Sequence, residues 1–383
     1  MTVTEAAPAP AAPEAKASKR RPLDWGNLAL SVAAPIVALL IAMGITSVLM
    51  AISGIDPGVA FSTIGKRFQE STAWIDATQA AVPLYISAIA VAIGFKMNLF
   101  NIGVEGQYRV AMLGTVAIGG LVELPPVLHV TFCILVAMTI GALWAAVPAV
   151  LKVYRGVSEV ISTIMLNYIA TGVLAFLFSE VFAQKKAGDL NPKSKVLPTS
   201  AWMPNIVEDN LHNITGFIFV AGLLGVVYYL VIWKSRFGFQ LRASGANPTA
   251  ARTAGINPKS MILRAMLLSG AVAGLVGMPQ LLGDKHAYSS DLQLQLGFDG
   301  IAVALLGRNS PAGIAAAAMT FGFLDSAARF LDLESIPKEI VTIMQGVLVL
   351  TVVVVYEIVR RIKERRTQEA ASRALDASLV VAA

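Results

Sequence analysis

The sequence has few charged residues for its length. Asp, Glu, Lys and Arg make up 14% of its 383 residues, whereas hydrophobic residues make up 56%. Soluble domains carry roughly 25% charged residues, so a water-soluble protein of this length could not cover its surface with so few. The composition therefore excludes a water-soluble protein and predicts an integral membrane protein.

Cysteine and histidine are also scarce. The single cysteine, Cys133, lies inside an apolar run, which excludes a disulfide framework. His129, His212 and His286 are far apart in the chain, and no Cys/His cluster has the spacing of a structural zinc site. We therefore expect no bound metal, and we interpret the histidines as solvated or packed side chains.

Motifs for catalysis and nucleotide binding are missing from the sequence. It contains no H-E-x-x-H or G-x-S-x-G motif, and no G-x-x-x-x-G-K-[ST] phosphate-binding loop. In "GINPKS", Pro258 occupies the place of the second glycine of such a loop. The apolar runs also lack the Asp and Glu residues expected of a proton- or sodium-coupled pump. If ATP drives this protein, another chain hydrolyses it.

Long apolar runs dominate the rest of the chain. A bilayer span needs about 20 mostly apolar residues, and its backbone polar groups must be satisfied internally, which requires helices. The runs predict an all-α, polytopic membrane protein of about ten transmembrane helices, including broken or re-entrant segments, of which "GFDGIAVALLGRN" is too short to cross upright. The predicted spans are residues 28–52, 79–97, 104–122, 127–151, 159–182, 213–233, 261–282, 298–307, 312–330 and 339–359.

The distribution of lysine and arginine predicts the orientation. With the N-terminus inside, most of the 30 basic residues fall on the inner side, so both termini are predicted to be cytoplasmic. We expect residues 1–27 to be a disordered cytoplasmic tail, residues 28–360 to be the transmembrane domain, and residues 361–383 to be a second cytoplasmic tail. The net charge of +6 follows from this asymmetry and needs no nucleic-acid partner.

The segment 234–260, "KSRFGFQLRASGANPTAARTAGINPKS", carries five basic residues and no acidic one. Asn247 can cap a helix, Pro248 suits its first position, and Gly255 suits a left-handed residue just after its end. Asn257 repeats the cap signal at the start of the next span. Two turns of isolated helix are unstable in water. This segment is therefore either a basic loop near the acidic headgroups of membrane lipid or a docking element for a cytoplasmic partner.

The stretch "GFKMNLFNIGVEGQ", which begins at Gly94, places amides and glycines between two apolar runs. Glycines permit a break in a helix, and broken helices line cavities in which amides face a passing solute. Asn98, Asn101 and Gln107 could hydrogen-bond a neutral polar solute without the cost of burying a charge. The stretch therefore predicts a broken helix on a solute pathway.

Other polar residues in the spans have two interpretations. Glu105 and Arg109 are four positions apart and could neutralise one another on one helix face, or they could fix helix ends at the inner interface. Asn167, in "SEVISTIMLNYIA", could face the pathway or join two helices with about 1 kcal/mol of stabilisation.

Two further features concern helix packing. Gly270 and Gly274 form a G-x-x-x-G motif, which favours close approach of a second helix. Pro279 is expected to break or bend its helix near Gln280.

Four blocks in the same order along the chain resemble the permease subunits of bacterial ABC importers for simple sugars and nucleosides. They are "GFKMNLFNIGVEGQYRVAMLG", "GVSEVISTIMLNYIA", "GANPTAARTAGINPKSMI" and "GFDGIAVALLGRNSPAGI". The resemblance covers most of residues 80–360, and it is nearest to permeases of nucleoside importers within the superfamily that also holds branched-chain amino acid permeases.

The resemblance implies a multi-pass subunit of the bacterial cytoplasmic membrane that binds no cofactor and performs no covalent chemistry. It implies three partners: a second, homologous permease in a heterodimer, a cytoplasmic ATPase that binds ATP-Mg, and an extracytoplasmic substrate-binding lipoprotein. It also implies that a coupling helix docks on the ATPase, with Arg242, Asn247, Pro248, Ala251, Arg252, Gly255 and Ile256 as its candidate residues.

The solute path implied by the resemblance runs near the broken helices. A nucleoside offers a base that can stack on aromatic rings and ribose hydroxyls that can bond amides. The candidate pathway residues are Phe95, Asn98, Phe100, Asn101, Glu105, Gln107, Asn167, Gln280, Phe298 and Asp299.

Other functions remain open from the sequence. The same permease type could carry ribose, galactose or branched-chain amino acids, and an amino-acid carboxylate would favour a cation such as Arg109 in the path. A different class is an ion-coupled secondary carrier that works alone. A non-transporting membrane enzyme or scaffold would need a polar catalytic set, which the sequence does not contain.

Overall fold

We describe the protein from a computed structural model, which describes residues 25–184, 191–209, 212–289 and 292–382. The chain divides into two compact units. The larger is Ala38–Val354, and the smaller combines Met1–Val37 with Val355–Ala383. The described parts of the smaller unit, residues 25–37 and 355–382, are helical.

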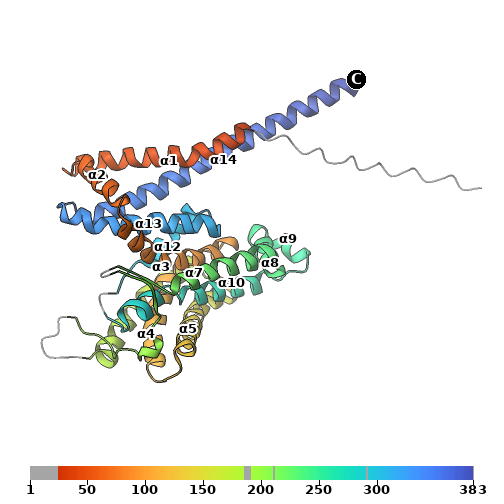
Figure 1. The fold of residues 1–383 in the computed structure, drawn as a ribbon. Helices are drawn as coiled ribbons and strands as arrows, with labels where there is room; N and C mark the ends of the chain where they lie inside the picture. The colour runs from red at the N-terminus through yellow and green to blue at the C-terminus, as the bar shows by residue number, and fades with distance from the viewer. Residues whose placement is uncertain (1–24, 185–190, 210–211, 290–291, 383) are drawn as a thin grey trace, which may run out of the picture. The chain divides into compact units, whose positions relative to one another are not determined.

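Helices make up most of the described structure (Figure 1). The prediction of a helical, polytopic membrane protein is confirmed, with one short β-hairpin as an exception. The helices are α1 (Trp25–Ile52), α2 (Pro57–Phe68), α3 (Ser71–Lys96), α4 (Val104–Gly119), α5 (Pro126–Arg155), α6 (Glu159–Leu177), α7 (Phe217–Tyr229), α8 (Arg236–Ala246), α9 (Pro248–Thr253), α10 (Pro258–Ala273), α11 (Met278–Gln280), α12 (Leu296–Leu306), α13 (Pro311–Leu333) and α14 (Glu339–Ala382). π-helical turns at Phe178–Phe182, Leu230–Lys234 and Leu281–Lys285 extend α6, α7 and α11, and a 3-10 turn covers Thr199–Ala201.

Among the described residues, seven helices are long and apolar enough to cross a membrane, and Ile36–Ile52 and Leu296–Leu306 are shorter apolar helices. The expected count of about ten spans stays a prediction. The segment 298–307 was expected to be too short to cross upright, and α12 has only 11 residues. At about 1.5 Å per residue it reaches roughly half of a 30 Å hydrocarbon core.

One local expectation was wrong. The span predicted from residue 213 begins instead at Phe217, because residues 213–215 belong to an antiparallel hairpin of β1 (Asn205–Asp209) and β2 (His212–Thr215). The expected break near Gln280 is present and lies just before Pro279, since α10 ends at Ala273 and α11 starts at Met278. The amphipathic helix α2 was not predicted, although Asp56 caps it by accepting a 2.7 Å hydrogen bond from the Gly58 N–H.

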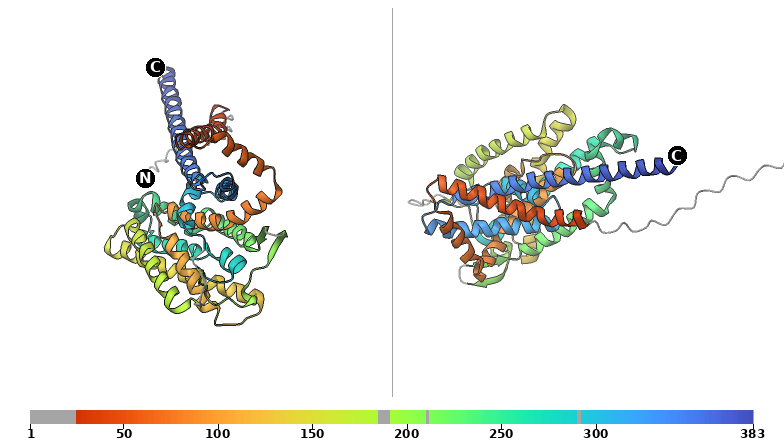
Figure 2. Two further views of the ribbon diagram at one scale, coloured as in Figure 1. Left: turned by 90° about the vertical axis from the view of Figure 1, so that its left-hand side faces the viewer. Right: turned by 90° about the horizontal axis from the view of Figure 1, so that it is seen from above.

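Helix α3 lies at the centre of the larger unit. It packs against α7, α10, α12 and α13, which are far from it in sequence (Figure 2). In the 18-residue apolar stretch of α3, 72% of the residues are buried, whereas the corresponding share in α5 is 22%. Much of α5 therefore faces outward. The predicted close packing at the G-x-x-x-G motif is confirmed: a Cβ on Gly274 would lie 2.1 Å from the carbonyl oxygen of Ala137 on α5.

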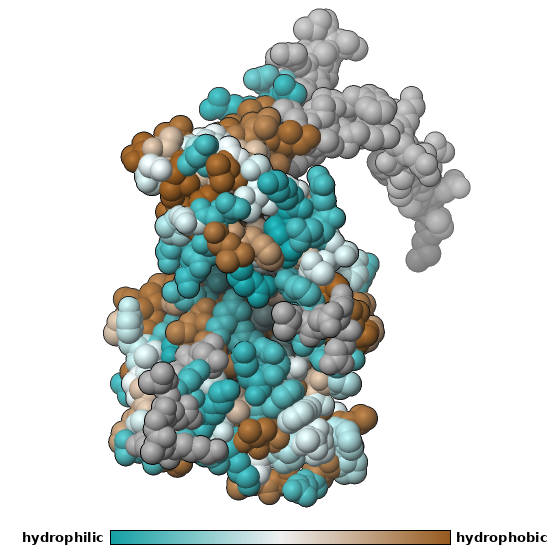
Figure 3. Space-filling view, turned by 60° about the vertical axis from the view of Figure 1, so that its left-hand side comes forward, coloured by the Kyte–Doolittle hydropathy of each residue, from teal (hydrophilic) through white to brown (hydrophobic). Residues whose placement is uncertain are grey.

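The larger unit has two ends of different character. The basic end holds the links 97–103 and 156–158 and the segment 234–260, and α8 and α9 mark it in Figure 1. The hairpin end holds residues 120–125, 191–209, 212–216, 286–289 and 292–295, which are joined by contacts such as the Leu197 N–H to His286 carbonyl bond of 2.9 Å. Hydrophilic residues are prominent on the face that Figure 3 shows, which looks toward the hairpin end.

Candidate functional site

The predicted break after α3 is present. Helix α3 ends at Lys96, residues 97–103 are not helical, and α4 begins at Val104. Asn98 adopts the left-handed conformation with φ 58°, which asparagine tolerates better than most residues. The Leu99 N–H then bonds back to the carbonyl of Gly94 at 3.0 Å. The chain therefore reverses tightly at the basic end before α4 starts.

Asn101 organises a buried polar network at this break. Its side-chain nitrogen donates to Ser269 Oγ at 2.8 Å and to Gln107 Oε1 at 3.0 Å. Its oxygen accepts from the Gly103 N–H at 3.1 Å and from Gln107 Nε2 at 3.0 Å. Ser269 donates onward to the Ala90 carbonyl on α3. Asn101 and Gln107 are each 1% exposed, so the network joins the link to α3, α4 and α10.

Glu105 joins the starts of two helices. It lies on the first turn of α4 and is 5% exposed. Its carboxylate accepts hydrogen bonds from the N–H groups of Gln295 at 3.1 Å and Gly297 at 3.0 Å, where α12 begins. Tyr108 Oη donates to the same carboxylate at 3.0 Å. Of the two interpretations given to Glu105 and Arg109, the contacts of Glu105 favour fixing of helix starts, and Arg109 donates to Thr171 on α6.

Asn167 ties α6 to the same region. Its oxygen accepts from the Gly106 N–H at 2.9 Å, and its nitrogen donates to the Ile102 carbonyl at 3.0 Å. Both groups are backbone groups at the start of α4, which a helix start leaves without intrahelical partners. Of the two interpretations given to Asn167, the contacts favour a role in joining helices.

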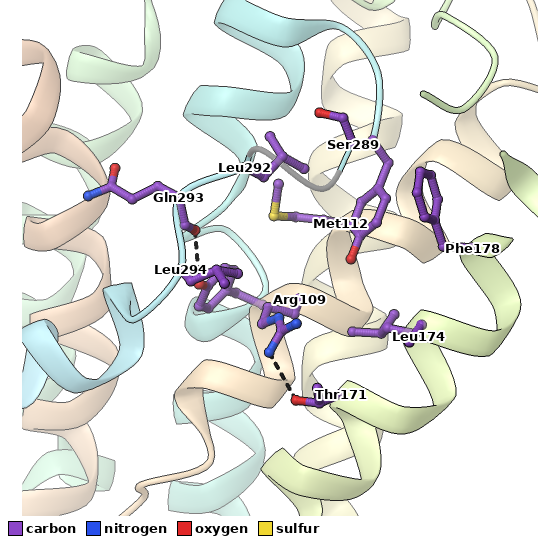
Figure 4. Close-up of a pocket in the computed structure, with 12 residues that line it drawn as sticks. Arg109, Met112, Thr171, Leu174, Phe178, Ser289, Leu292, Gln293 and Leu294 are labelled. Atoms are coloured by element: carbon purple, nitrogen blue, oxygen red, sulfur yellow. Dashed lines mark hydrogen bonds between the residues drawn. The ribbon is translucent and has the colours of Figure 1, made fainter. Parts of the chain in front are cut away.

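A cavity of about 290 Å³ lies beside this junction, toward the hairpin end (Figure 4). Arg109 and Met112 come from α4, Thr171 and Leu174 from α6, and the segment before α12 closes the opposite wall. The remaining lining residues are Tyr108, Ala175, Phe178, Tyr288, Ser289, Leu292, Gln293 and Leu294.

The cavity wall combines aromatic and polar groups. The rings of Phe178 and Tyr288 meet edge to face, with centroids 5.3 Å apart. Arg109 is the charged residue of the lining. Its Nε is buried and has no hydrogen-bond partner among the described residues, whereas its Nη1 bonds Thr171 at 3.0 Å. A buried guanidinium nitrogen without an acceptor is a group that a bound solute could satisfy.

The other predicted pathway residues lie outside this cavity. Phe95 and Phe100 form an edge-to-face pair with centroids 5.0 Å apart, and Phe100 is 45% exposed. Phe298 is also 45% exposed, and Asp299 beside it is half-buried on the first turn of α12. Asn98 lies at the basic end against α8, α9 and α10.

Gln280 contacts the cavity wall. Its side chain exchanges two hydrogen bonds with Gln293, of 2.8 and 3.1 Å, and Gln293 lines the cavity. Gln280 is therefore placed to position Gln293.

Most of the cavity was not predicted from the sequence. Phe178 and Leu174 are ordinary apolar residues of a span, and Tyr288 and Gln293 lie in a loop that carries no motif. The available signal was the clustering of Tyr288, Ser289 and Gln293 just before the short helix 298–307, since discontinuous helices border solute sites.

The coupling segment has the predicted local structure. Asn247 caps α9 by accepting 3.0 Å hydrogen bonds from the N–H groups of Thr249 and Ala250, and Gly255 is left-handed with φ 77°. Asn257 caps α10 in the same way.

The side chains of this segment differ in exposure: Ala251 and Ile256 are buried, whereas Arg252 is exposed. The short helix α9 therefore presents Arg252 outward.

Arg242 lies on the neighbouring helix α8, with its guanidinium over the ring of Trp233, 4.6 Å from the centroid.

Comparison with known proteins identifies the family. The model for "Branched-chain amino acid transport system / permease component" matches residues 75–353. The chain belongs to this family. It is a multi-pass transport subunit of the cytoplasmic membrane and not an enzyme, and the resemblance predicted from four sequence blocks is confirmed.

Three relatives of this permease show the range of sequence identity and of named solutes among similar proteins. The guanosine ABC transporter permease protein NupP of Bacillus subtilis is 34% identical over 85% of this chain and 93% of its own length. The guanosine ABC transporter permease protein NupQ of the same organism is 24% identical over 68% and 82%. The glucose ABC transporter permease protein TsgB13 of Haloferax volcanii is 29% identical over 84% and 87%.

Proposed function

We propose that this permease is the membrane-spanning subunit of an ATP-driven importer of nucleosides. The proposal rests on the cavity between α4, α6 and the segment before α12, together with the similarity to guanosine permeases. The cavity volume of about 290 Å³ lies near the lower limit of small-molecule sites, which is roughly 300 Å³. A small solute with one flat ring system and a few polar groups suits a cavity of this size and lining.

A purine nucleoside has matching chemistry. Its base can pack against the ring of Phe178 or Tyr288, because every base has a π-face. The guanidinium of Arg109 can donate to the O6 and N7 acceptors of guanine, which is the geometry by which arginine recognises that base. The side chain of Gln293, which also lines the cavity, can bond a ribose hydroxyl. These contacts are few, so release on the other side of the membrane is not prevented.

The basic end is proposed to face the cytoplasm and to dock on an ATPase through α9. The cap at Asn247 and the left-handed Gly255 fix a short helix whose Arg252 is exposed. Movement of α9 would reach the 97–103 link through the adjoining end of α8, since a Cβ on Gly245 there would lie 2.7 Å from the backbone of Met97. Through the link it would reach the Asn101 network and α4. ATP-Mg would be bound by the partner ATPase and not by this chain.

The remaining partners are a second permease and a binding protein. Two Bacillus subtilis permeases match this chain at different identities, 34% and 24%. This supports pairing with a related but different permease. An extracytoplasmic binding lipoprotein would deliver the solute at the hairpin end, where hydrophilic residues are prominent (Figure 3).

The first test is uptake of labelled guanosine, ribose, glucose and leucine by cells that lack this chain, complemented with the wild type or with Arg109→Gln. We expect guanosine uptake alone to depend on the chain, and Arg109→Gln to raise the half-saturating concentration for transport. Loss of glucose or ribose uptake instead would keep the importer and replace the solute class.

A branched-chain amino acid is the second candidate, because Arg109 is a cation that could pair with a carboxylate. Leucine uptake that depends on Arg109, with guanosine uptake unchanged, would support it. Uptake that persists when ATP is depleted but stops when the membrane potential is collapsed would favour an ion-coupled carrier and contradict the importer.

A further inference from the structure

A second cavity, of about 480 Å³, lies at the basic end, away from the proposed solute cavity. Its walls come from five segments: the 97–103 link and the ends of α5 and α8, together with α9 and the start of α10. The charged residues that line it are Lys152, Arg252 and Lys259, so all of them are positive.

The chain itself supplies little negative charge to balance these cations. Lys152 pairs with the carboxylate of Glu159 at the start of α6. Arg252 and Lys259 have no ion pair with any described residue, and the segment 234–260 contains no acidic residue. Two exposed cations therefore face one cavity without a counter-charge.

The cavity also contains a buried hydroxyl without a partner. Ser244 is 1% exposed and lines the cavity, and its Oγ makes no hydrogen bond to any described residue. Buried polar groups nearly always have a partner, so the Ser244 hydroxyl is a group that a bound ligand could satisfy. Asn98, held in the left-handed turn after α3, adds an exposed amide to the same lining. These polar side chains can all donate hydrogen bonds.

We propose that this cavity binds the phosphate group of an anionic ligand. A phosphate offers several strong acceptor oxygens, which match two cations, a hydroxyl and an amide. The phosphate could belong to the headgroup of an anionic phospholipid or to a soluble compound such as a nucleoside monophosphate. Helix α9 forms one wall and the 97–103 link another, so the bound phosphate joins the coupling helix to the broken helix. Occupancy therefore regulates how movement of α9 reaches α4, whichever solute is carried.

The test uses the full-length chain in lipid nanodiscs and measures the thermal unfolding midpoint. In discs of phosphatidylcholine, inorganic phosphate and guanosine monophosphate are titrated against potassium chloride at equal ionic strength. In a second set, phosphatidylglycerol replaces part of the phosphatidylcholine. The variants are Lys259→Gln and Ser244→Ala. Lys234→Gln is the matched control, because Lys234 belongs to the same segment, 234–260, but lines a different cavity.

We expect a rise in the midpoint with a phosphate-bearing probe beyond the effect of potassium chloride. Lys259→Gln is expected to weaken the response about tenfold in half-saturating concentration, as removal of one charge-assisted hydrogen bond does, and Ser244→Ala is expected to weaken it less. Lys234→Gln should respond like the wild type. A response only to the soluble probes identifies a soluble ligand, and a response only to phosphatidylglycerol identifies a lipid headgroup. The proposal is overturned if no probe exceeds the salt control, if both cavity variants respond like the wild type, or if Lys234→Gln is affected equally.

Discussion

Glu105 and Gly297 join two helix starts that are 192 positions apart: the Glu105 carboxylate accepts a 3.0 Å hydrogen bond from the Gly297 N–H. Gly297 leaves no room for a side chain, because a Cβ there would lie 2.4 Å from the backbone nitrogen of Glu105. A carboxylate is favourable at a helix N-terminus, where unpaired N–H groups carry partial positive charge. Glu105 therefore caps the short helix α12 from a different helix, next to the proposed solute cavity.

Replacing Glu105 by Gln should weaken this junction. The amide oxygen of Gln can accept from one N–H, but its NH₂ group would face another donor, at Gln295 or Gly297. We expect Glu105→Gln to lower the free energy of unfolding by about 1–3 kcal/mol, which is the usual cost of an unsatisfied buried group. Denaturant titration of the purified chain in detergent micelles, followed by circular dichroism, measures this difference.

The matched control for this change is Glu123→Gln, since Glu123 is exposed at the hairpin end. It should leave the unfolding curve unchanged. Equal unfolding curves for Glu105→Gln and the wild type would show that the carboxylate charge does not hold α4 and α12 together.

The sequence predicted features that are encoded locally. The cap at Asn247, the left-handed Gly255 and the break after α3 each depend on residues within a few positions of one another, and all three are present. The contacts of Asn101 and Ser269 could not be predicted, because these residues are 168 positions apart and their pairing depends on how α3, α4 and α10 pack.

Dependence on contacts between distant segments also explains why most of the candidate site was not predicted from the sequence. Amides such as Asn101 and Asn167 were predicted to face the solute, but a buried amide next to a broken helix is first used to satisfy the freed backbone groups. The cavity is lined instead by aromatic and apolar side chains of spans and of a loop, whose meeting point depends on tertiary structure. Arg109 was recognised as a possible solute-binding cation only because a cation inside a span is rare.

The contact between α5 and α10 gives a second prediction. Adding a methyl group at Gly274 would place it against the backbone of Ala137, which cannot move away without separating the helices. We expect Gly274→Ala to cost about 1–3 kcal/mol of stability, as overpacking typically does. Gly172→Ala is the matched control, because no atom lies within 4 Å of a Cβ there. It should stabilise α6 by roughly 0.5–1 kcal/mol. Similar unfolding curves for both variants would contradict close packing at Gly274.

Charge reversal at Arg252 tests the coupling role of α9. Arg252 is exposed and α9 is capped by Asn247, so the change should leave the helix and membrane insertion intact. We expect Arg252→Glu to reduce ATP-driven uptake at least about tenfold, because it puts a repulsive charge at the proposed ATPase contact. The amount of chain in the membrane fraction is measured alongside uptake. Arg236→Glu, a change at another exposed arginine, on α8, should transport normally. Normal uptake by Arg252→Glu would remove the docking role.

His286, at the hairpin end, should make stability depend on pH. The ring of His286 stacks on Trp202, with centroids 3.9 Å apart and planes 9° apart. Burial lowers the pKa of His286 from its ordinary value, and this outweighs the opposite effect of Asp284. The Nδ1 atom is buried without a partner among the described residues. The folded state therefore favours the neutral ring.

The direction of the pH effect follows from proton linkage. Below about pH 6.5, the ordinary histidine pKa, the unfolded chain binds a proton at His286 more readily than the folded chain does. The contribution of His286 is therefore complete above that pH and is lost as the pH falls through the lowered pKa of the folded state. We expect the unfolding midpoint to decrease as the pH falls from about 7 to about 5, and His286→Gln to remove most of that decrease. His212→Gln should retain it, since that residue lies in β2 and bonds Asp76. A decrease of the same size in His286→Gln would mean that other groups cause it, and the stacked ring on Trp202 would then be without influence on the pH dependence.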